Sequence, residues 1–576
     1  MDNTAIAGLF HRIADILELQ GGDLFRIRAY RNAALTIQDL PRQLSDMARE
    51  DPDSLKHLPG IGPAFREKLH EILTTGRLKK YDELSASVPE GIFELLRLEG
   101  LGPKRVKLLH ERLKISSVAQ LEEACRQGKL AKLPGLGEKT QEKLLASIQK
   151  YRQTQGRLTL AEAWQHASAL LDYLREGKLM GRIEAAGSLR RGKDTIGDLD
   201  VLATAARPAK AAAHFLKFPR VKEVLQHGDT KCAVRLASGL QVDLRIVAPA
   251  QFGAALVYFT GSKEHNVRLR DLAKSRGLKV NEYGVFKGAS SKSLAGKTEE
   301  EVYAALKLAW IPPELREDHG EIDAARTGRL PRLVEVRDIK GDLHSHTTAT
   351  DGRHSIQAMI EAAKAKGYDY VAITDHTKST RVAGGLNERQ FAAHLTKIRK
   401  TAKAVPGIRV LCGTECDILP DGSLDLPDAL LADMDVVVIS VHSHFKMARD
   451  AMTRRILRAL DNRHATVLAH PTGRLIGTRP PYEVDLEAVC KKAVERGIFL
   501  EVNAQSTRLD LKDSHCRFAK ELGARFVIST DAHSTLDFNN IRYGVMTARR
   551  GWLEPKDVVN TLPLDGFLKA IKRGQS

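Results

Sequence analysis

Nine side chains of the types that bind metal ions stand at or near the ends of short apolar runs in the C-terminal half of the chain. These candidate ligands are His344, His346, Asp351, His376, Glu415, His442, His470, Asp531 and His533. Mixed imidazole and carboxylate ligands suit Zn²⁺ or Mn²⁺ better than Mg²⁺ alone. Nine ligands exceed the needs of one ion, so we expect two or three ions, with a carboxylate such as Glu415 as a bridge. Clustered ions produce hydroxide at neutral pH and bind a phosphate group, which predicts hydrolysis of a phosphoester.

Three aspartates in the first half of the chain have the pattern of a second, different metal site. Asp198 and Asp200 alternate with apolar residues in DLDVLAT, and Asp243 does the same in LQVDLRIVAP. On β-strands this alternation puts carboxylates on one face and apolar side chains on the other. Mg²⁺ prefers hard oxygen ligands and usually shares them with substrate phosphates. The adjacent turn GSLRRG offers Ser188 and Arg191 to phosphate oxygens, so the sequence predicts in-line phosphoryl transfer with two metal ions.

A Gly-x-Gly turn followed by an amphipathic helix occurs three times before residue 150. The glycines of the three copies and the lysines beside two of them are Gly60, Gly62, Gly100, Gly102, Lys104, Gly135, Gly137 and Lys139. None completes Gly-x-Gly-x-x-Gly after a strand, so a dinucleotide-binding fold is disfavoured. A helix-hairpin-helix fits better, because its glycines let the backbone approach a ligand and its helix N-terminus binds a DNA phosphate without reading the sequence. The alternative is a helical hairpin that uses these glycines only to turn.

The elements around the nine candidate ligands have to place them on one face. Beyond residue 338, short apolar runs such as DYVAIT, DVVVISV and RFVIST alternate with amphipathic helices, which is typical of parallel βα units. In a βα barrel the C-terminal ends of the strands meet on one face, where active sites lie. The charged, proline-bearing stretch before these units indicates a linker.

Composition and charge favour a partner of opposite sign. The 576 residues include 90 Lys and Arg against 72 Asp and Glu, a formal net charge of +18. The length predicts several domains, and the charge favours nucleic acid, the alternative being a basic protein without such a partner. Six scattered cysteines without a CxxC pair fit a reducing cytoplasm. No apolar run comes near the ~20 residues that cross a bilayer, so we expect no membrane partner.

The motifs GSLRRG, GDLDVL, VDLR, YFTGS and NEYG, in this order, resemble those of family X DNA polymerases over roughly residues 1–318. The resemblance implies that Asp198, Asp200 and Asp243 hold Mg²⁺, with Asp243 as the base toward the primer 3′-hydroxyl. It also implies that the incoming deoxynucleoside triphosphate (dNTP) and the template base are contacted by Ser188, Arg191, Gly197, Tyr258, Phe259, Asn266 and Arg270. Judged from the residues alone, the Tyr-Phe pair would be ordinary core.

The N-terminal helices resemble the lyase domain of the same family. Lys68 in FREKLHEIL matches the lysine that forms a Schiff base, and Tyr30 and Lys80 match its pocket. Two positions depart from the family: Ala64 stands where a second phosphate-binding lysine is expected, and Gln241 replaces an arginine that contacts the primer phosphate in many relatives. The resemblance therefore implies a 5′-deoxyribose phosphate lyase, with a solvated helix lysine as the alternative.

Residues 339–576 resemble the polymerase and histidinol phosphatase (PHP) domain, whose nine-residue metal pattern is matched in type and order. This resemblance implies a distorted βα barrel. It further implies a Mn²⁺-dependent 3′–5′ exonuclease that acts on DNA, so that the second site removes what the first one adds or cleans blocked 3′ ends.

We therefore predict a multidomain protein with N-terminal all-α helix-hairpin-helix regions, an α+β nucleotidyltransferase palm and a C-terminal α/β distorted barrel. The predicted domains are 1–85 (lyase-like helices), 86–150 (helix-hairpin-helix DNA binding), 151–255 (palm), 256–318 (nucleotide selection), 319–338 (linker) and 339–576 (PHP). The leading hypothesis is a monomeric repair polymerase that fills short gaps in primer–template DNA with dNTPs and trims 3′ ends. The alternatives are a polymerase fused to a phosphatase of small monoesters, and a scaffold that binds DNA ends.

Overall fold

The computed structural model describes residues 3–574 except 39–43, 52–53, 59–60, 86–87, 90, 97, 99–100, 131–135, 138–139, 146, 149–156, 289 and 291. The chain divides into two compact units, Met1–Gln155 and Gly156–Ser576. Among the described residues, no helix is long and apolar enough to cross a membrane.

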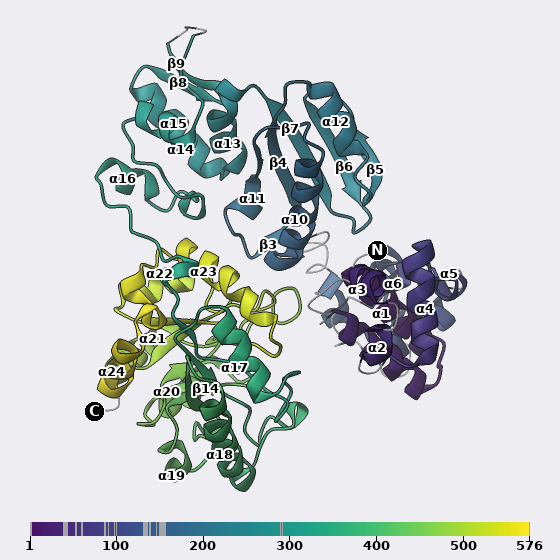
Figure 1. Cartoon of the computed structure of the whole chain (residues 1–576), viewed down its shortest axis with the longest axis vertical. Helices are drawn as coiled ribbons and strands as arrows, with labels where there is room; N and C mark the ends of the chain where they lie inside the picture. Colours follow the sequence, from purple (N-terminus) through teal and green to yellow (C-terminus); the bar gives the residue numbers. More distant parts are fainter. Residues whose placement is uncertain are drawn as a thin grey trace. The chain divides into compact units, whose positions relative to one another are not determined.

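The N-terminal unit consists of short helices around two apolar cores (purple to dark blue in Figure 1). Its helices are α1 (Asn3–Leu19), α2 (Leu24–Gln38), α3 (Leu44–Glu50), α4 (Pro63–Thr75), α5 (Lys79–Ser85), α6 (Gly91–Leu95), α7 (Pro103–Leu113) and α8 (Val118–Arg126). In the first core, the ring of Phe10 lies 5.7 Å from that of Tyr30 and 5.4 Å from that of Phe65. Helices α4 and α7 begin with proline after an extended glycine, Gly62 or Gly102. Proline suits the first helical position because its missing N–H would have no partner there.

The palm is a five-stranded sheet of order β2-β4-β7-β6-β5. Its elements are α10 (Leu160–Glu176), β2 (Ile183–Ala185), α11 (Gly187–Arg190), β4 (Asp198–Thr204), α12 (Pro208–Leu216), β5 (Val221–Gln226), β6 (Lys231–Leu236) and β7 (Gln241–Val247), and the short strands β1 (Leu158–Thr159) and β3 (Thr195–Ile196) pair separately. Leu199 on β4 and Val242 on β7 point into the core. Because β4 and β7 are parallel and in register, Asp200 lies directly beside Asp243.

The region after the palm combines helices with a three-stranded antiparallel sheet of order β10-β9-β8. Its elements are α13 (Phe252–Thr260), α14 (Lys263–Ser275), β8 (Leu278–Asn281), β9 (Gly284–Lys287), β10 (Ser293–Ala295), α15 (Glu299–Ala305) and α16 (Glu321–Arg326).

The segment 319–338, for which the sequence predicts a linker, is folded against this region. It contains α16, whose Ile322 and Ala325 join the apolar core of the region. Glu321 is fully buried, and its Oε1 lies 2.6 Å from Nδ1 of buried His265. The apolar residues of this segment are too widely spaced to give a helical or strand pattern. Its buried polar partner lies 56 positions earlier in the chain, so the sequence pattern indicated only a loose connection.

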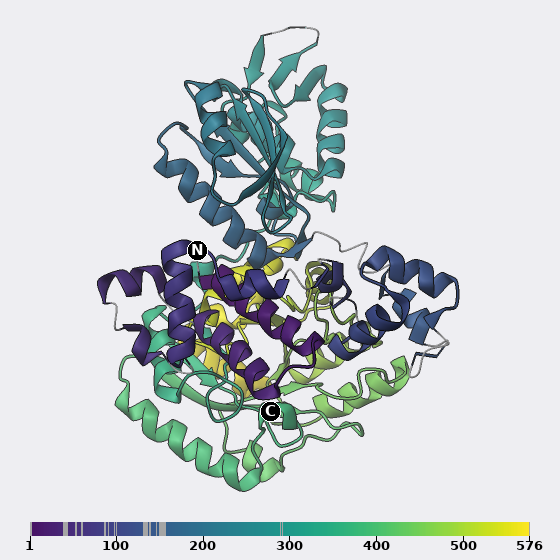
Figure 2. The same cartoon turned by 90° about the vertical axis from the view of Figure 1, so that its right-hand side faces the viewer.

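The C-terminal domain is a barrel of seven parallel strands that follow one another in chain order. The strands are β11 (Gly341–Asp342), β12 (Tyr370–Ile373), β13 (Arg409–Asp417), β14 (Val436–Ser440), β15 (Val467–Leu468), β16 (Phe499–Asn503) and β17 (Phe526–Ser529). The helices of this domain, green to yellow in Figure 2, are α17 (Ile356–Ala365), α18 (Glu388–Ala404), α19 (Asp428–Leu431), α20 (Arg449–Leu460), α21 (Leu486–Arg496), α22 (Asp513–Glu521), α23 (Ile541–Arg550) and α24 (Leu564–Gly574). An isolated parallel bridge between Ser345 and Ala532, just beyond the ends of β11 and β17, brings the first and last strands together, so the sheet is a nearly closed barrel, as predicted.

Candidate active sites

The barrel brings all nine predicted metal ligands together at the C-terminal ends of its strands. His344 and His346 follow β11, Asp351 precedes α17, His376 follows β12, Glu415 lies near the end of β13, His442 follows β14, His470 follows β15, and Asp531 and His533 follow β17. The C-terminal ends of parallel strands lie at the same edge of the barrel, so residues from distant parts of the sequence meet there.

Glu415 is the centre of this cluster. It is buried, and its two oxygens face five imidazoles. The distances to its nearer oxygen are 2.9 Å from His470 Nε2, 3.0 Å from His376 Nδ1, 3.2 Å from His442 Nε2, 3.3 Å from His344 Nε2 and 3.5 Å from His346 Nε2. One carboxylate with two oxygens between several imidazoles has the arrangement expected of a ligand that bridges two ions.

Two further aspartates flank Glu415. Oδ2 of Asp351 lies 3.4 Å from His533 Nε2 and 3.5 Å from His376 Nε2. Oδ1 of Asp531 lies 3.2 Å from His346 Nε2. Three groups have donor atoms within 4.8 Å of one another: His346 with Asp351, His376 and His533; His344 with His346 and Asp531; and His376 with Glu415 and His442.

The buried imidazoles fit metal ions better than they fit one another. Nε2 of His344 and both ring nitrogens of His346 are buried without a hydrogen-bond partner in the described structure, although carboxylate oxygens lie within 3.6 Å of the two Nε2 atoms and 3.9 Å from Nδ1 of His346. Burial lowers the pKa of His346 to about 4, and His533 and His376 contribute to the same shift. Although burial raises it, the imidazoles of His442, His344 and His376 hold the pKa of Glu415 well below its ordinary value. Although burial acts in the opposite direction, the neighbouring carboxylates raise the pKa of His344 and His376 instead, so these imidazoles balance the buried negative charge with protons, which a metal ion displaces when it binds.

Two buried carboxylates that the sequence analysis missed hold this cluster in place. Oε1 of Glu501 lies 2.8 Å from Nδ1 of His344, and its Oε2 accepts from the backbone amide of His470. Asp375 accepts from the amide of Thr347 and, at 2.8 Å, faces Nε2 of His394. A carboxylate behind a metal-binding histidine fixes the tautomer and the ring orientation. The sequence does contain a signal for Glu501, because it is an acidic residue in the largely apolar strand FLEVN.

In the palm, the structure brings the three predicted carboxylates onto neighbouring strands. Asp198 is exposed, whereas Asp200 and Asp243 are half-buried. Burial, together with the carboxylates of Asp198 and Asp243, raises the pKa of Asp200 to about 7. Such crowding of like charges is relieved by a cation, so the donor set fits Mg²⁺. Gly187 has a φ of 61°, and a Cβ there would lie 2.2 Å from Oδ2 of Asp200, so only glycine lets the turn pass so close to the carboxylate.

The predicted phosphate-binding turn runs from α11 toward β4. Arg191 is largely buried, and its Nη1 donates to the carbonyl of Thr260 at 2.5 Å. Ser188 is half-buried on α11. A Cβ on Gly197, just before β4, would lie 2.9 Å from Nη1 of Arg157. Gln241 donates at 2.8 Å to Oδ2 of Asp243, so in this structure it orients the carboxylate.

The predicted nucleotide-facing residues gather at α13 and α14. Tyr258 is 39% exposed, which excludes the reading of this residue as ordinary core. Its ring packs edge-on against Phe259, over which Arg245 lies. Asn266 donates to the carbonyl of Tyr258 at 2.7 Å, and both line a small recess together with Arg270.

In the N-terminal unit, Lys68 lies on α4 beside the aromatic cluster. Its Nζ donates to the carbonyl of Ala64 at 2.8 Å and lies 5.7 Å from the ring of Phe65. Burial lowers the pKa of Lys68, and the charges of Arg26 and Lys80 lower it further. Tyr30 is buried nearby in the same core. A lysine with a lowered pKa has a larger neutral fraction, which an attack on an aldehyde requires.

The helix-hairpin-helix turns are described in part. Gly60, Gly100, Gly135 and Lys139 lie outside the described residues, and so does the side chain of Lys104. Gly62, Gly102 and Gly137 are described, and a Cβ on any of them would meet nothing within 4 Å. Gly62 and Gly102 are extended, not left-handed, so they serve here for close approach to the helix ends and not for an unusual backbone angle.

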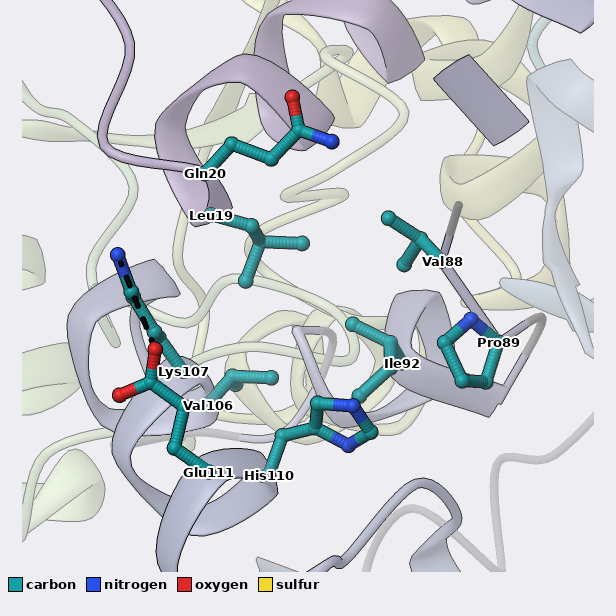
Figure 3. A pocket seen from close by; sticks show the side chains of 9 residues that line it. All are labelled: Leu19, Gln20, Val88, Pro89, Ile92, Val106, Lys107, His110 and Glu111. Carbon is teal, nitrogen blue, oxygen red and sulfur yellow. Dashed lines mark ion pairs between the residues drawn. The ribbon is translucent and has the colours of Figure 1, made fainter. Parts of the chain in front are cut away.

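A cavity of about 300 Å³ in the N-terminal unit lies between the end of α1 and helix α7 (Figure 3). Its walls are Leu19, Gln20, Val88, Pro89, Ile92, Val106, Lys107, His110 and Glu111. Its charged pair, Lys107 and Glu111, are 4.0 Å apart. Lys68 is not among the residues that line it, so this cavity does not form the predicted lyase pocket.

Comparison with known protein families finds four matches along the chain. A helix-hairpin-helix domain matches residues 1–78, a SAM-like helix-hairpin-helix tandem 92–150, a DNA polymerase beta thumb 255–317 and a PHP domain 342–505. The PHP match ends before Asp531 and His533, which the structure nevertheless places in the same cluster.

Curated relatives resemble either the whole chain or one part of it. DNA polymerase lambda of Arabidopsis thaliana is 28% identical over 348 residues, which cover 54% of this chain and 62% of that protein. A probable phosphatase of Caldanaerobacter subterraneus is 30% identical over 209 residues, which cover 34% of this chain and 77% of that protein. The DNA polymerase/3′-5′ exonuclease PolX of Bacillus subtilis is 38% identical over 575 residues, covering 100% of both chains. With a full-length relative at this identity, the chain belongs to the family X DNA polymerases that carry a C-terminal PHP domain.

Proposed function

We propose that the chain extends DNA primers across short gaps at the palm and removes nucleotides from DNA 3′ ends at the barrel. One observation carries the proposal: the chain holds two separate clusters of metal-type side chains, one of aligned carboxylates and one of mixed ligands, in which eight residues form groups suited to a metal ion and His470 contacts Glu415. The full-length Bacillus relative is named for both a polymerase and a 3′–5′ exonuclease. The Arabidopsis relative, which covers 54% of this chain, is named as DNA polymerase lambda, which supports a repair polymerase that fills gaps.

At the palm, we assign Asp198, Asp200 and Asp243 as the residues that would hold two Mg²⁺ ions, and such ions would supply charge neutralisation for in-line phosphoryl transfer. Asp243 takes the proton of the primer 3′-hydroxyl, in keeping with its place beside Asp200. Ser188 and Arg191 hold the triphosphate of the dNTP. Tyr258, Phe259, Asn266 and Arg270 bind its sugar and face the base and the template, as their grouping at α13 and α14 supports.

At the barrel, we assign the nine ligands to two or three Mn²⁺ or Zn²⁺ ions. When bound, such ions supply a hydroxide at neutral pH and stabilise the charge of the attacked phosphate. Glu501 keeps His344 in the tautomer that leaves Nε2 directed at Glu415. The helix-hairpin-helix turns hold the backbone of the same DNA.

We also propose a 5′-deoxyribose phosphate lyase in which the amine of Lys68 forms an imine with the sugar aldehyde. Its lowered pKa and its place beside Phe65, whose ring packs against Tyr30, support the assignment. Borohydride should trap a covalent complex between wild-type protein and a DNA with an incised abasic site, and Lys68→Ala should lack it. Equal trapping by the variant would move the role to another lysine, with Lys80 the next candidate.

We further propose that the enzyme acts as a monomer in the cytoplasm. All six cysteines are free and buried, which suits a reducing compartment.

A second candidate function for the barrel is hydrolysis of small phosphate monoesters. It is favoured by the likeness of this domain to proteins named as probable phosphatases. An assay with a 5′-labelled primer–template, Mg²⁺ or Mn²⁺, and dNTPs present or absent separates the readings. We expect longer products with dNTPs and shorter ones without. An untouched primer together with rapid release of phosphate from p-nitrophenyl phosphate would favour the second function.

A further inference from the structure

The phosphate-binding turn of the palm is in direct contact with the barrel domain. Arg550, the last residue of α23, has a side chain only 4% exposed. Its Nη1 donates to the backbone carbonyl of Arg191 at 2.8 Å and to Oε1 of Glu317 at 2.9 Å. Its other nitrogens pair with Asp513 on α22, at 2.7 Å from Nη2. The guanidinium of Arg550, a barrel residue, therefore orients two groups of the polymerase half, the carbonyl of Arg191 and the carboxylate of Glu317.

Glu317 transmits this contact to the side chain of Arg191. The Nε of Arg191 lies 2.9 Å from Oε1 of Glu317, the same oxygen that Arg550 contacts. Although burial raises it, Arg550, Arg191 and Lys193 hold the pKa of Glu317 below its ordinary value, so the carboxylate is ionised at neutral pH.

The two fixed bonds of Arg191 determine how its guanidinium is presented. Its Nε is bonded to Glu317 and its Nη1 to the carbonyl of Thr260. A guanidinium is planar and has five donors in fixed directions, so bonds at Nε and Nη1 fix its plane and leave the donors of Nη2 for a phosphate. The turn that carries Arg191 passes directly by Asp200: the amide of Arg191 donates to the carbonyl of Gly187, where an added Cβ would lie 2.2 Å from Oδ2 of Asp200. This places Arg191 by the site where the triphosphate is expected.

Close packing makes this contact stiff. Gly192, with a φ of 66°, lies against α23 so closely that an added Cβ would be 3.0 Å from Cε of Met546. On the other side of the turn, Asp194 is 3.1 Å from Nη1 of Arg474, another barrel residue. Arg474 also donates to the carbonyl of Leu509, whose side chain is part of the palm core. The second half of the turn, residues 191–194, is thus held by the barrel domain at three positions.

We propose that Arg550 of the barrel domain and Glu317 are positioning residues of the polymerase site, which set its affinity for dNTPs by fixing Arg191. The proposal rests on the assignment of Arg191 to the triphosphate. It makes the barrel domain a structural part of the polymerase, independently of its own hydrolytic chemistry.

The test compares single-nucleotide gap filling by the full-length protein and its variants at varied dNTP concentration. Arg550→Met should raise the KM for dNTP about tenfold, the effect of ~1.4 kcal/mol of lost orientation, and should leave kcat within about twofold because the metal ligands are untouched. Arg550→Lys should recover part of the KM, since it keeps the charge but not the fork. Degradation of DNA 3′ ends should equal that of the wild type, which also reports that the barrel is folded.

The neighbouring residue gives a matched control. Arg549 is on the same helix, is 17% exposed, and pairs with its own carboxylate, Glu314, at 2.6 Å. Arg549→Met removes an equivalent ion pair between the same two regions without touching Arg191. Its KM for dNTP should equal that of the wild type; a rise equal to that of Arg550→Met would mean that any loosening of this interface has the effect, and would overturn the proposal.

Two further variants make every outcome decisive. Glu317→Gln keeps one acceptor for Arg191 but loses the charge, so we expect a rise in KM of about threefold. An unchanged KM in this variant, or a lower kcat at constant KM, would show that the contact is only structural and refute the proposal even if Arg550→Met fails to fold.

Arg191→Met tests the assignment of Arg191 to the triphosphate, on which the proposal rests. If its KM for dNTP is unchanged, the assigned role of Arg191 is wrong. If its KM rises while those of the Arg550 and Glu317 variants do not, only the proposed action of Arg550 and Glu317 through Arg191 is wrong.

Discussion

The palm carboxylates are exposed or half-buried and lie on strands, whereas the barrel imidazoles of His344, His346 and His470 are buried on loops that follow strands. The palm offers ligands of one chemical type, and the barrel mixes nitrogen and oxygen donors around one carboxylate, Glu415. An open carboxylate set can exchange ions together with each nucleotide, because water replaces a lost ion. Buried imidazole nitrogens without partners are costly to leave unbonded, so the barrel is built around ions that stay.

The comparison predicts first that the two chemistries separate completely by mutation. Asp198→Asn combined with Asp200→Asn removes charged ligands from both palm ions and should lower primer extension by about four orders of magnitude. Degradation from the 3′ end should persist at the wild-type rate, because no barrel ligand changes. Denaturing gels of a labelled primer–template measure both. The exchange of Asp172→Asn, an exposed residue of α10 paired with Arg175, controls for loss of acidic charge in the palm. Substantial extension by the double variant would sink the palm assignment.

The second prediction is the converse of the first: barrel ligands are removed and the palm is left intact. His344→Ala with His346→Ala removes two donors that face Glu415 and Asp531 and should slow 3′ degradation about 1000-fold while extension persists. Mn²⁺ should activate the wild-type barrel more than Mg²⁺ does, since imidazole favours Mn²⁺ and Zn²⁺. Metal content measured by mass spectrometry after dialysis should fall by at least one ion in the double variant. Full retention of both metal and degradation would contradict the assignment.

The part of each site that could be predicted from the sequence differs between the palm and the barrel. Strand alternation was enough to place Asp198 and Asp200 on one face, and the register of β4 with β7 then put Asp243 beside them. In the barrel, the His, Asp and Glu residues at or near the ends of the predicted strands were enough to identify the nine candidate ligands. Glu501 was missed because it lies inside a strand and serves His344, 157 positions away; local pattern carries no information on such a pairing. The relay from Arg550 to Arg191 spans 359 positions and was invisible for the same reason.

The third prediction concerns the residues that support the barrel ligands. Glu501→Gln keeps the shape of the side chain but removes the charge that faces Nδ1 of His344, and should lower metal affinity or degradation by about 10- to 100-fold. Because the glutamine can still bond to the imidazole, the loss should be smaller than that of removing the ligands. Titration of the metal-free protein with Mn²⁺, read by activity and by intrinsic fluorescence, measures it. Glu495→Gln, at an exposed glutamate on α21 paired with Lys492, is the matched control; equal behaviour of the two variants would refute a role for Glu501.

The smallest effect is expected at the helix-hairpin-helix turns, for which we propose contacts with the DNA backbone. Gly102 precedes α7 with φ −86° and ψ 168°, and a Cβ there meets nothing within 4 Å. Gly102→Ala should therefore leave the free energy of unfolding within about 0.5 kcal/mol of the wild type. Its methyl group would stand in front of the amides at the start of the helix and keep a DNA phosphate at a greater distance, so the Kd for gapped duplex should rise about two- to fivefold. Gly8→Ala within α1, where an added Cβ also meets nothing, should bind DNA as the wild type does. Fluorescence anisotropy at low and high salt measures both variants. The difference should shrink as salt screens the phosphate contact, and identical affinities of the two variants at low salt would mean that this glycine only shapes the turn.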